Sequence, residues 1–399
     1  MQDYKKCAIE RLSATSDNME VWWDSSPLIY KSWAEKMVNA EDDSYKSTLK
    51  AQLDALFNAD NPENTVFDGV TTNPRLTSNV LNLISDEVNP TVDKLIKDNP
   101  ARTTNEIAWE VYKAITEQGT KLYMPLFEKS GYKKGYVSAQ VDPNLITNTR
   151  EMLRQALELK KLGDNIMIKC PGSKEGIFAI QILTSLGIPT NSTLVFNVPQ
   201  AIAVAKAVKA GLELGKSKGV DYKKWRSVIT IMLARFEDRE QFAESAKSVG
   251  IELTAELKRW SGIAIAKKAL ALLNDPANGY SSKLLLCSSR VGPTPDVVYH
   301  IEKIAGANMV FTINPEMIAD FNKLYREKDV TNTWQEPVPK DIMDKLLKIP
   351  YFIEGYDENG IKDDDFVDQP SFQYTANEFL GSMKFIEDYV EGRKKLNVK

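Results

Sequence analysis

The stretch TNTREMLRQALELKKLGDNIMIKC (147–170) combines two hydrophobic patterns, and it decides the fold. Apolar residues recur at helical spacing in its first part: Leu153, Ala156, Leu157 and Leu162. Its last part, NIMIKC (165–170), is a short apolar run typical of a buried strand. The stretch therefore predicts a helix that leads into a strand, which is the repeating element of a βαβ fold.

Similar β-rich runs recur along the whole chain, and helical patterns such as 199–214 separate them. We predict seven further strands, at 20–24, 65–71, 135–142, 191–197, 227–233, 283–289 and 308–313. Eight strands that alternate with helices predict parallel βαβ units. A doubly wound sheet would also fit this alternation, but eight units in a chain of 399 residues favour a closed (β/α)₈ TIM barrel, an α/β fold.

No Gly/Ser-rich or Pro-rich linker divides the sequence. We therefore expect a single domain over residues 1–399, a (β/α)₈ barrel with additional helices. Residues 110–131 have a helical pattern between the second and third strands, and the region after 314 is predominantly helical. This second region predicts a helical C-terminal tail.

The amino-acid composition excludes several classes of protein function. Hydrophobic residues make up 43% of the chain, charged residues 27%, and the net charge is −4, so no general attraction to nucleic acid or membranes is expected. No apolar run approaches the roughly 20 residues that span a bilayer, and the N-terminal segment has no secretory pattern. Three scattered cysteines fit neither a disulfide framework nor a metal site, and we expect a cytoplasmic protein.

The single histidine, His300, restricts the chemistry further. Zinc sites with two histidines are impossible, so acid–base steps depend mainly on carboxylates, lysine, tyrosine or water. The segment AGLELGKS (210–217) resembles a phosphate loop, but it lacks the first glycine and follows a helix. We interpret it as a helix end capped by Gly215, and we expect Gly163 and Gly187 to end helices in the same way.

Lys169 lies at the end of the apolar run 165–170. The ordinary interpretation is a lysine that extends its ammonium group into water. The alternative is a lysine held in a pocket, where burial lowers its pKa and leaves a neutral amine able to form a Schiff base with a carbonyl compound.

Polar residues lie within the predicted strands or directly after them, and we expect them at the rim where a TIM barrel has its active site. They comprise one carboxylate, several amides and hydroxyls, the lysine and two arginines: Asp24, Thr72, Asn73, Ser138, Gln140, Lys169, Asn191, Thr193, Thr230, Arg235, Ser288 and Arg290. Each alone could be a turn or surface residue. Together they predict a binding site, since convergent polar groups in one cavity define such sites.

Schiff-base aldol chemistry fits these residue types. Lys169 would attack a ketone, and the resulting iminium would draw electrons from the neighbouring C–C bond. Asp24 is the carboxylate available to move protons, and the arginines suit a phosphate because guanidinium binds it in a bidentate manner. The predicted substrate is a phosphorylated keto sugar. Cys170 follows Lys169, so it should face the other side of the strand and be structural.

Five motifs resemble the transaldolase family, in the family's order and with similar spacing: GVTTNPRL (69–76), SAQVD (138–142), IMIKCPGSKEGI (166–177), GIPTNSTLVFNVPQA (187–201) and CSSR (287–290). The resemblance implies a (β/α)₈ barrel with Lys169 as Schiff-base lysine and Asp24 as acid/base. It implies transfer of a dihydroxyacetone unit from a ketose phosphate to an aldose phosphate, without cofactor or metal, in an enzyme that can be a homodimer.

The resemblance also assigns roles to the other residues. Thr193 matches a threonine that helps to hold a bound water, and Thr72 lies in the matching TTNP motif. Asn73, Ser138 and Asn191 match residues that contact sugar hydroxyls. The phosphate would be bound by Thr230, Arg235, Ser288 and Arg290.

The chain departs from the family pattern in three places. Gln140 replaces a glutamate of typical transaldolases, as in the related fructose-6-phosphate aldolases, although those have a tyrosine where this chain has Met232. Thr230 replaces a serine. An aldolase that releases dihydroxyacetone therefore stays open as an alternative. A silent sugar-phosphate binding protein is a third hypothesis, against which the presence of both Lys169 and Asp24 argues.

Overall fold

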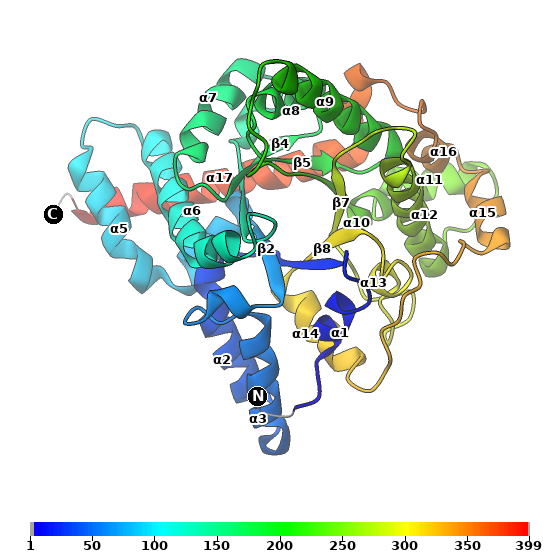
Figure 1. Cartoon of the computed structure of the whole chain (residues 1–399), viewed down its shortest axis with the longest axis horizontal. Coiled ribbons are helices and arrows are strands. Elements are labelled where there is room, and N and C mark those ends of the chain that lie inside the picture. Colours follow the sequence, from blue (N-terminus) through cyan, green and yellow to red (C-terminus); the bar gives the residue numbers. More distant parts are fainter. Residues whose placement is uncertain (1–3, 398–399) are drawn as a thin grey trace.

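The computed structural model describes residues 4–397 and contains a closed barrel of eight parallel strands, ordered as in the sequence (Figure 1). This topology confirms the predicted (β/α)₈ fold and excludes the doubly wound sheet. Each strand begins and ends within two residues of its prediction. The strands are β1 (Glu20–Trp23), β2 (Phe67–Thr71), β3 (Tyr136–Gln140), β4 (Ile166–Pro171), β5 (Thr190–Val195), β6 (Ser227–Met232), β7 (Lys283–Cys287) and β8 (Met309–Ile313).

Helices surround the barrel, and further helices lie to either side of it (Figure 1). They are α1 (Ala8–Ser13), α2 (Tyr30–Ala40), α3 (Asp43–Leu56), α4 (Pro74–Leu83), α5 (Ser85–Asp98), α6 (Thr104–Lys129), α7 (Thr149–Lys160), α8 (Lys174–Ser185), α9 (Val198–Ser217), α10 (Leu233–Glu237), α11 (Glu240–Ser248), α12 (Ala255–Asn274), α13 (Tyr299–Glu302), α14 (Pro315–Leu324), α15 (Lys340–Leu346), α16 (Pro350–Tyr356) and α17 (Pro370–Asn397). None of these helices is both long and apolar enough to cross a membrane.

The additional helices lie where the sequence predicts them. Helices α4, α5 and α6 separate β2 from β3, and α14 to α17 form the C-terminal tail. Asn73 starts α4, since its side chain accepts a hydrogen bond from the Leu76 N–H and Pro74 occupies the first turn. The division into one domain over 1–399 stays a prediction, and residues 1–3 and 398–399 lie outside the described part.

The predicted helix ends are correct in one case of three. Gly187 has a φ of +72° and follows α8, as a terminating glycine does. Helix α7 ends at Lys160 with Lys161 as its cap, so Gly163 lies beyond the helix end. Gly215 lies inside α9, which continues to Ser217, and Gly219 is the residue with a positive φ, +73°. A Cβ atom on Gly215 would lie 2.6 Å from the carbonyl oxygen of Ser185 at the end of α8, so close packing of the two helices requires this glycine inside α9 despite its weak helix propensity.

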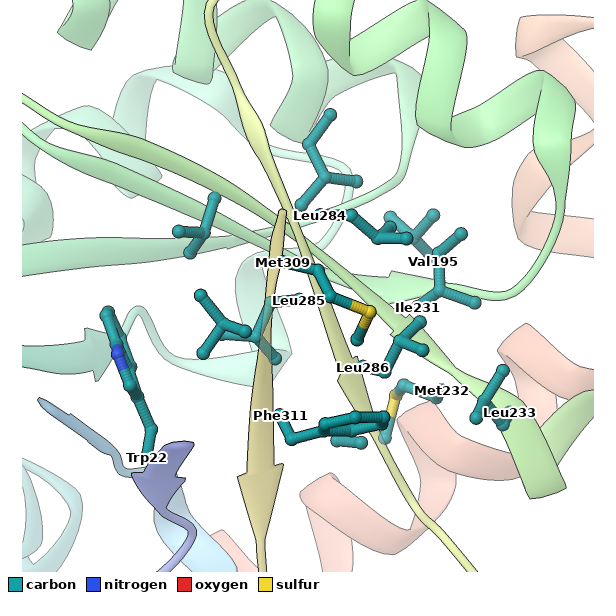
Figure 2. Close-up of a cluster of buried hydrophobic side chains, with 14 of the residues drawn as sticks. Trp22, Val195, Ile231, Met232, Leu233, Leu284, Leu285, Leu286, Met309 and Phe311 are labelled. Atoms are coloured by element: carbon teal, nitrogen blue, oxygen red, sulfur yellow. The ribbon is translucent and has the colours of Figure 1, made fainter. Parts of the chain in front are cut away.

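Apolar side chains hold the barrel together on both sides of its wall. Leu284, Leu285 and Leu286 are consecutive buried residues of β7, so both faces of that strand are covered. Figure 2 shows them in one cluster with Trp22 of β1 and with residues of β8. A parallel strand enclosed by helices outside and side chains inside requires such an uninterrupted apolar run.

Strand β1 contributes side chains to the barrel interior at successive levels, because residues two apart point the same way. Glu20 begins the strand, Trp22 lies in its middle, and Asp24 follows its end. A Cβ atom on Gly69 of β2 would lie 2.7 Å from the Trp22 ring, so glycine is needed there.

Glu20 is the centre of a charged cluster at the N-terminal end of the barrel. Its Oε1 lies 2.6 Å from Arg226 and 2.6 Å from Lys283, and the Trp22 indole N–H donates to its Oε2 at 3.1 Å. Burial opposes its ionisation, but these two cations outweigh burial and lower the pKa of Glu20 to about 2. The cluster closes the barrel at the end opposite the predicted active site.

We expect Glu20→Gln to lower the free energy of unfolding by about 3 kcal/mol, because it leaves two buried cations without their counter-charge. Since the folded pKa lies below that of the unfolded chain, the stabilising effect should be present above about pH 4.5 and lost as pH falls towards 2. Urea denaturation at pH 7 and at pH 3 measures both effects. The exposed pair Asp43–Lys46 provides the control, since Asp43→Asn should cost less than about 1 kcal/mol.

Candidate active site

Lys169 lies inside the barrel, near the C-terminal end of β4. It is 4% exposed, and its neighbours in register are Gln140 of β3 and Asn191 of β5. Burial lowers its pKa, an effect that the nearby Asp24 and Cys287 partly oppose. The extended, water-exposed lysine is therefore excluded, and the side chain is one that can lose its proton readily.

Asp24 follows β1 and shares the barrel mouth with Lys169. Its Oδ1 accepts a hydrogen bond from the Thr71 hydroxyl at 2.5 Å, and the Thr312 hydroxyl lies 2.6 Å from that of Thr71. Burial raises the pKa of Asp24, while Lys169 and the Thr71 hydrogen bond act in the opposite direction. A carboxyl with a raised pKa next to an amine with a lowered pKa is suited to exchange protons with a bound molecule.

Thr71, which lies in the quoted motif 69–76, and Thr312 are site residues that the predicted set does not include. Because Thr71 donates its single hydroxyl proton to Asp24, Thr312 must donate to Thr71, and the two form a chain that orients the carboxylate. Both are inward residues near strand ends, which is the only signal that could have indicated them.

Three predicted site residues form a second buried chain. The Thr230 hydroxyl donates to Oδ1 of Asn191 at 2.7 Å, and Nδ2 of Asn191 donates to the Ser138 hydroxyl at 2.9 Å. The chain links β3, β5 and β6 across the barrel beside Lys169. It fixes the orientation of the Asn191 amide, since oxygen and nitrogen each have a defined partner.

Gln140 and Thr193 have buried oxygen atoms that face the interior. Oε1 of Gln140 and Oγ1 of Thr193 form no hydrogen bond with any residue between 4 and 397. The Gln140 backbone N–H donates to the Tyr112 hydroxyl at 2.7 Å, which holds the end of β3 in place. Buried polar atoms of this kind carry a cost in free energy, so they point to a site that binds a polar molecule.

Thr72 and Asn73 are engaged by the protein itself. The Thr72 hydroxyl donates to the Ser138 carbonyl at 2.8 Å and joins the ends of β2 and β3. The Asn73 Oδ1 caps α4. Only the amino group of Asn73 is then left to donate to a ligand.

The two predicted arginines follow neighbouring strands, β6 and β7, at the same end of the barrel. Arg235 is in α10, directly after β6, and Arg290 is in the loop after β7, where Ser288 has a φ of +59°. Burial lowers the pKa of Arg290, with the nearby Arg235 as a further cause. The structure therefore brings together the side chains that would form an anion-binding end.

His300 is buried and holds the loop that carries Arg290 in place. Its Nδ1 accepts a hydrogen bond from the Arg290 backbone N–H at 3.1 Å, so its Nε2 carries the proton and donates to Oε1 of Glu237 at 2.7 Å. Arg259 pairs with the other oxygen of Glu237. The single histidine is thus a buried link between the segments that carry the two arginines.

The cysteines differ in their relation to the site. Cys170 is fully buried, and burial raises its pKa to about 12, as expected for the structural role predicted for it. Cys287 is close enough to Asp24 and Lys169 for their charges to affect its ionisation, which the sequence analysis missed. Burial also raises the pKa of Cys287 to about 12, so the thiol keeps its proton and does not compete with the amine as a nucleophile.

Comparison with known proteins agrees with this geometry. The Transaldolase/Fructose-6-phosphate aldolase family model matches residues 51–371. A transaldolase of Thiobacillus denitrificans is 31% identical over 271 residues, which cover 63% of this chain and 72% of the relative. Transaldolase 2 of Streptomyces avermitilis is 27% identical over 298 residues, 70% of this chain and 78% of the relative. A transaldolase of Trichodesmium erythraeum is 30% identical over 234 residues, which cover 52% of this chain and 61% of the relative.

These matches and the closed barrel define a (β/α)₈ enzyme of the aldehyde- and ketone-transferring class. The chain belongs to the transaldolase/fructose-6-phosphate aldolase family. The predicted family, fold and enzyme class are confirmed.

The pH dependence of imine formation should follow the lowered pKa of Lys169. We expect borohydride trapping of dihydroxyacetone at Lys169 to rise with pH and to level off below about pH 10, since an exposed lysine titrates near 10.4. Asp24→Asn removes a negative charge that favours the ammonium form, so the rise should move to lower pH. Mass spectrometry of trapped protein gives both midpoints, and a shift to higher pH would contradict the electrostatic coupling.

Proposed function

We propose that this protein transfers a dihydroxyacetone unit from a ketose phosphate, such as sedoheptulose 7-phosphate or fructose 6-phosphate, to an aldose phosphate. The observation that carries the proposal is the burial of Lys169 beside Asp24 at the C-terminal end of the barrel. Binding a sugar phosphate alone would need neither a buried amine nor a carboxyl coupled to it, which disfavours the silent binding protein.

The reaction begins with attack of the neutral Lys169 Nζ on the ketone carbon. The carbinolamine hydroxyl leaves as water with a proton taken from a bound water molecule, which gives the iminium. Asp24 then accepts the proton of the sugar hydroxyl next to the scissile bond, the C–C electrons move to the iminium, and an aldehyde leaves. The remaining enamine attacks the acceptor aldehyde, and the same steps in reverse release the product.

The sugar would lie along the polar interior. Asn73, Ser138 and Asn191 would bind its hydroxyls, and Gln140 with Thr193 would position a water molecule near the enamine. Arg235 and Arg290, with Ser288, would bind the phosphate. Thr230 was predicted to share this role, but its hydroxyl donates its one proton to Asn191, so it would orient that amide instead. The homodimer and the cytoplasmic location stay part of the proposal.

Gln140 favours a second candidate function within the same chemistry. A glutamine cannot carry a proton as a glutamate does. The substitution therefore changes proton transfer between a bound water molecule and the enamine. An aldolase that cleaves fructose 6-phosphate and releases dihydroxyacetone is the resulting alternative.

Trapping experiments test the nucleophile. We expect borohydride with fructose 6-phosphate to label Lys169, and Lys169→Arg to remove the label and the activity, because arginine keeps its charge. Asp24→Asn should still form the imine but turn over about 10²–10⁴-fold more slowly. Lys267 is the matched control, since burial lowers its pKa to about 8 although it lies in α12, outside the barrel. Label that persists in Lys169→Arg and disappears in Lys267→Arg would refute the assignment.

An acceptor assay separates transfer from cleavage. With fructose 6-phosphate alone, a transaldolase should stop after about one turnover per active site, because the enamine has no acceptor. Addition of erythrose 4-phosphate should start steady turnover. Continuous release of glyceraldehyde 3-phosphate without an acceptor would instead establish the aldolase.

A further inference from the structure

The C-terminal helix α17 lies at the C-terminal end of the barrel, on the side of the proposed active site. Phe372 near its start packs against Phe196, directly after β5, with ring centroids 6.5 Å apart. Further along, the Ser382 carbonyl accepts a hydrogen bond from Ser78 of α4 at 3.2 Å. Figure 1 shows α17 in red, extending from the barrel towards α5 and α6. The helix therefore forms part of the wall around the barrel mouth.

The first turns of α17 place an aromatic ring and a carboxylate against the arginines that follow β6. Tyr374 and Glu378 are four residues apart, so they lie on one face of the helix. Oε2 of Glu378 is 2.7 Å from Nη2 of Arg235. The Arg239 guanidinium lies over the Tyr374 ring at 3.7 Å from its centroid, and that of Arg235 at 5.5 Å.

Both arginines of the anion-binding end are thus close to carboxylates of the protein. Arg235 is paired with Glu378, and Nε of Arg290 is 3.8 Å from Oδ2 of Asp238. The Arg235–Glu378 pair is the shorter and better shielded one, with side chains 12% and 31% exposed. Charges in such surroundings interact more strongly than in water.

We propose that Glu378 is a specificity-determining residue of the substrate site. It is an internal counter-anion of Arg235 that weakens the binding of a dianionic phosphate terminus relative to a monoanionic or uncharged one. A phosphate at Arg235 must share the guanidinium with Glu378 or displace it, and both costs grow with the negative charge of the ligand. The inference rests on the proposed function, since it takes Arg235 as the residue that meets the anionic end of the sugar.

Glu378→Gln tests the proposal, because glutamine keeps the shape of the side chain and removes its charge. We expect the ratio of KM for fructose to KM for fructose 6-phosphate to rise about 3- to 30-fold, mainly through a lower KM for the phosphate ester. Glu387→Gln on the same helix is the matched control. Glu387 accepts a hydrogen bond from Asn105 on the helix side away from the arginines, and its substitution should leave the ratio as it is.

A binding measurement separates this inference from the catalytic proposal. Calorimetric titration with inorganic phosphate requires no Schiff base, and Glu378→Gln should bind phosphate about 3- to 30-fold more tightly than the parent protein. If no imine forms at Lys169 but phosphate binding still tightens, the catalytic proposal fails and the role of Glu378 stands.

The opposite results would overturn the proposal. A ratio of KM values and a phosphate affinity that both stay constant in Glu378→Gln would make Glu378 a purely structural anchor of α17. Weaker phosphate binding together with a lower melting temperature would lead to the same conclusion. Glu378→Asp provides a second variant, since it keeps the charge but shortens the side chain, and it should give values between those of the parent and of Glu378→Gln.

Discussion

The burial of one ammonium group at the end of β4 is the constraint on which the site depends. Lys169 is nearly inaccessible to water. Its neighbours on β3 and β5, Gln140 and Asn191, both have uncharged amide side chains. The charged form is therefore poorly solvated, and Asp24 is the nearby anion that offsets part of this cost. A closed barrel provides these conditions because its wall excludes solvent on all sides of the strand.

Stability and chemistry are divided between the two ends of the same strands. On β1, Glu20 forms the charged cluster at the N-terminal end, while Asp24 at the other end is near enough to Lys169 for its charge to affect the pKa of the lysine. Glu20 is matched by two cations, so its pKa is lowered, whereas burial dominates at Asp24 and its pKa is raised. Charged residues at the N-terminal end of the barrel pair with one another and stabilise the fold. Residues at the C-terminal end keep polar atoms available for a ligand.

The helical tail contributes side chains to the barrel mouth. Helix α17 brings Tyr374 and Glu378 to the arginines after β6, so the anionic end of a substrate would meet a surface formed by two distant parts of the chain. The His300–Glu237 contact connects the loop of Arg290 to the segment of Arg235 from the other side. The geometry of the arginines therefore depends on tertiary contacts rather than on their strands alone.

The sequence alone determined the eight strands, the barrel and the convergence of Lys169, Asp24 and the polar strand ends. These features follow from local hydrophobic period and from residue type, which act over a few neighbouring residues. It could not indicate that Gly215 lies inside α9, that Thr312 supports Thr71 and Asp24, or that Cys287 lies near Lys169. Nor could it place Glu378 against Arg235. Barrel closure and helix docking decided those contacts, because they set distances between segments that have no periodic relation in the sequence.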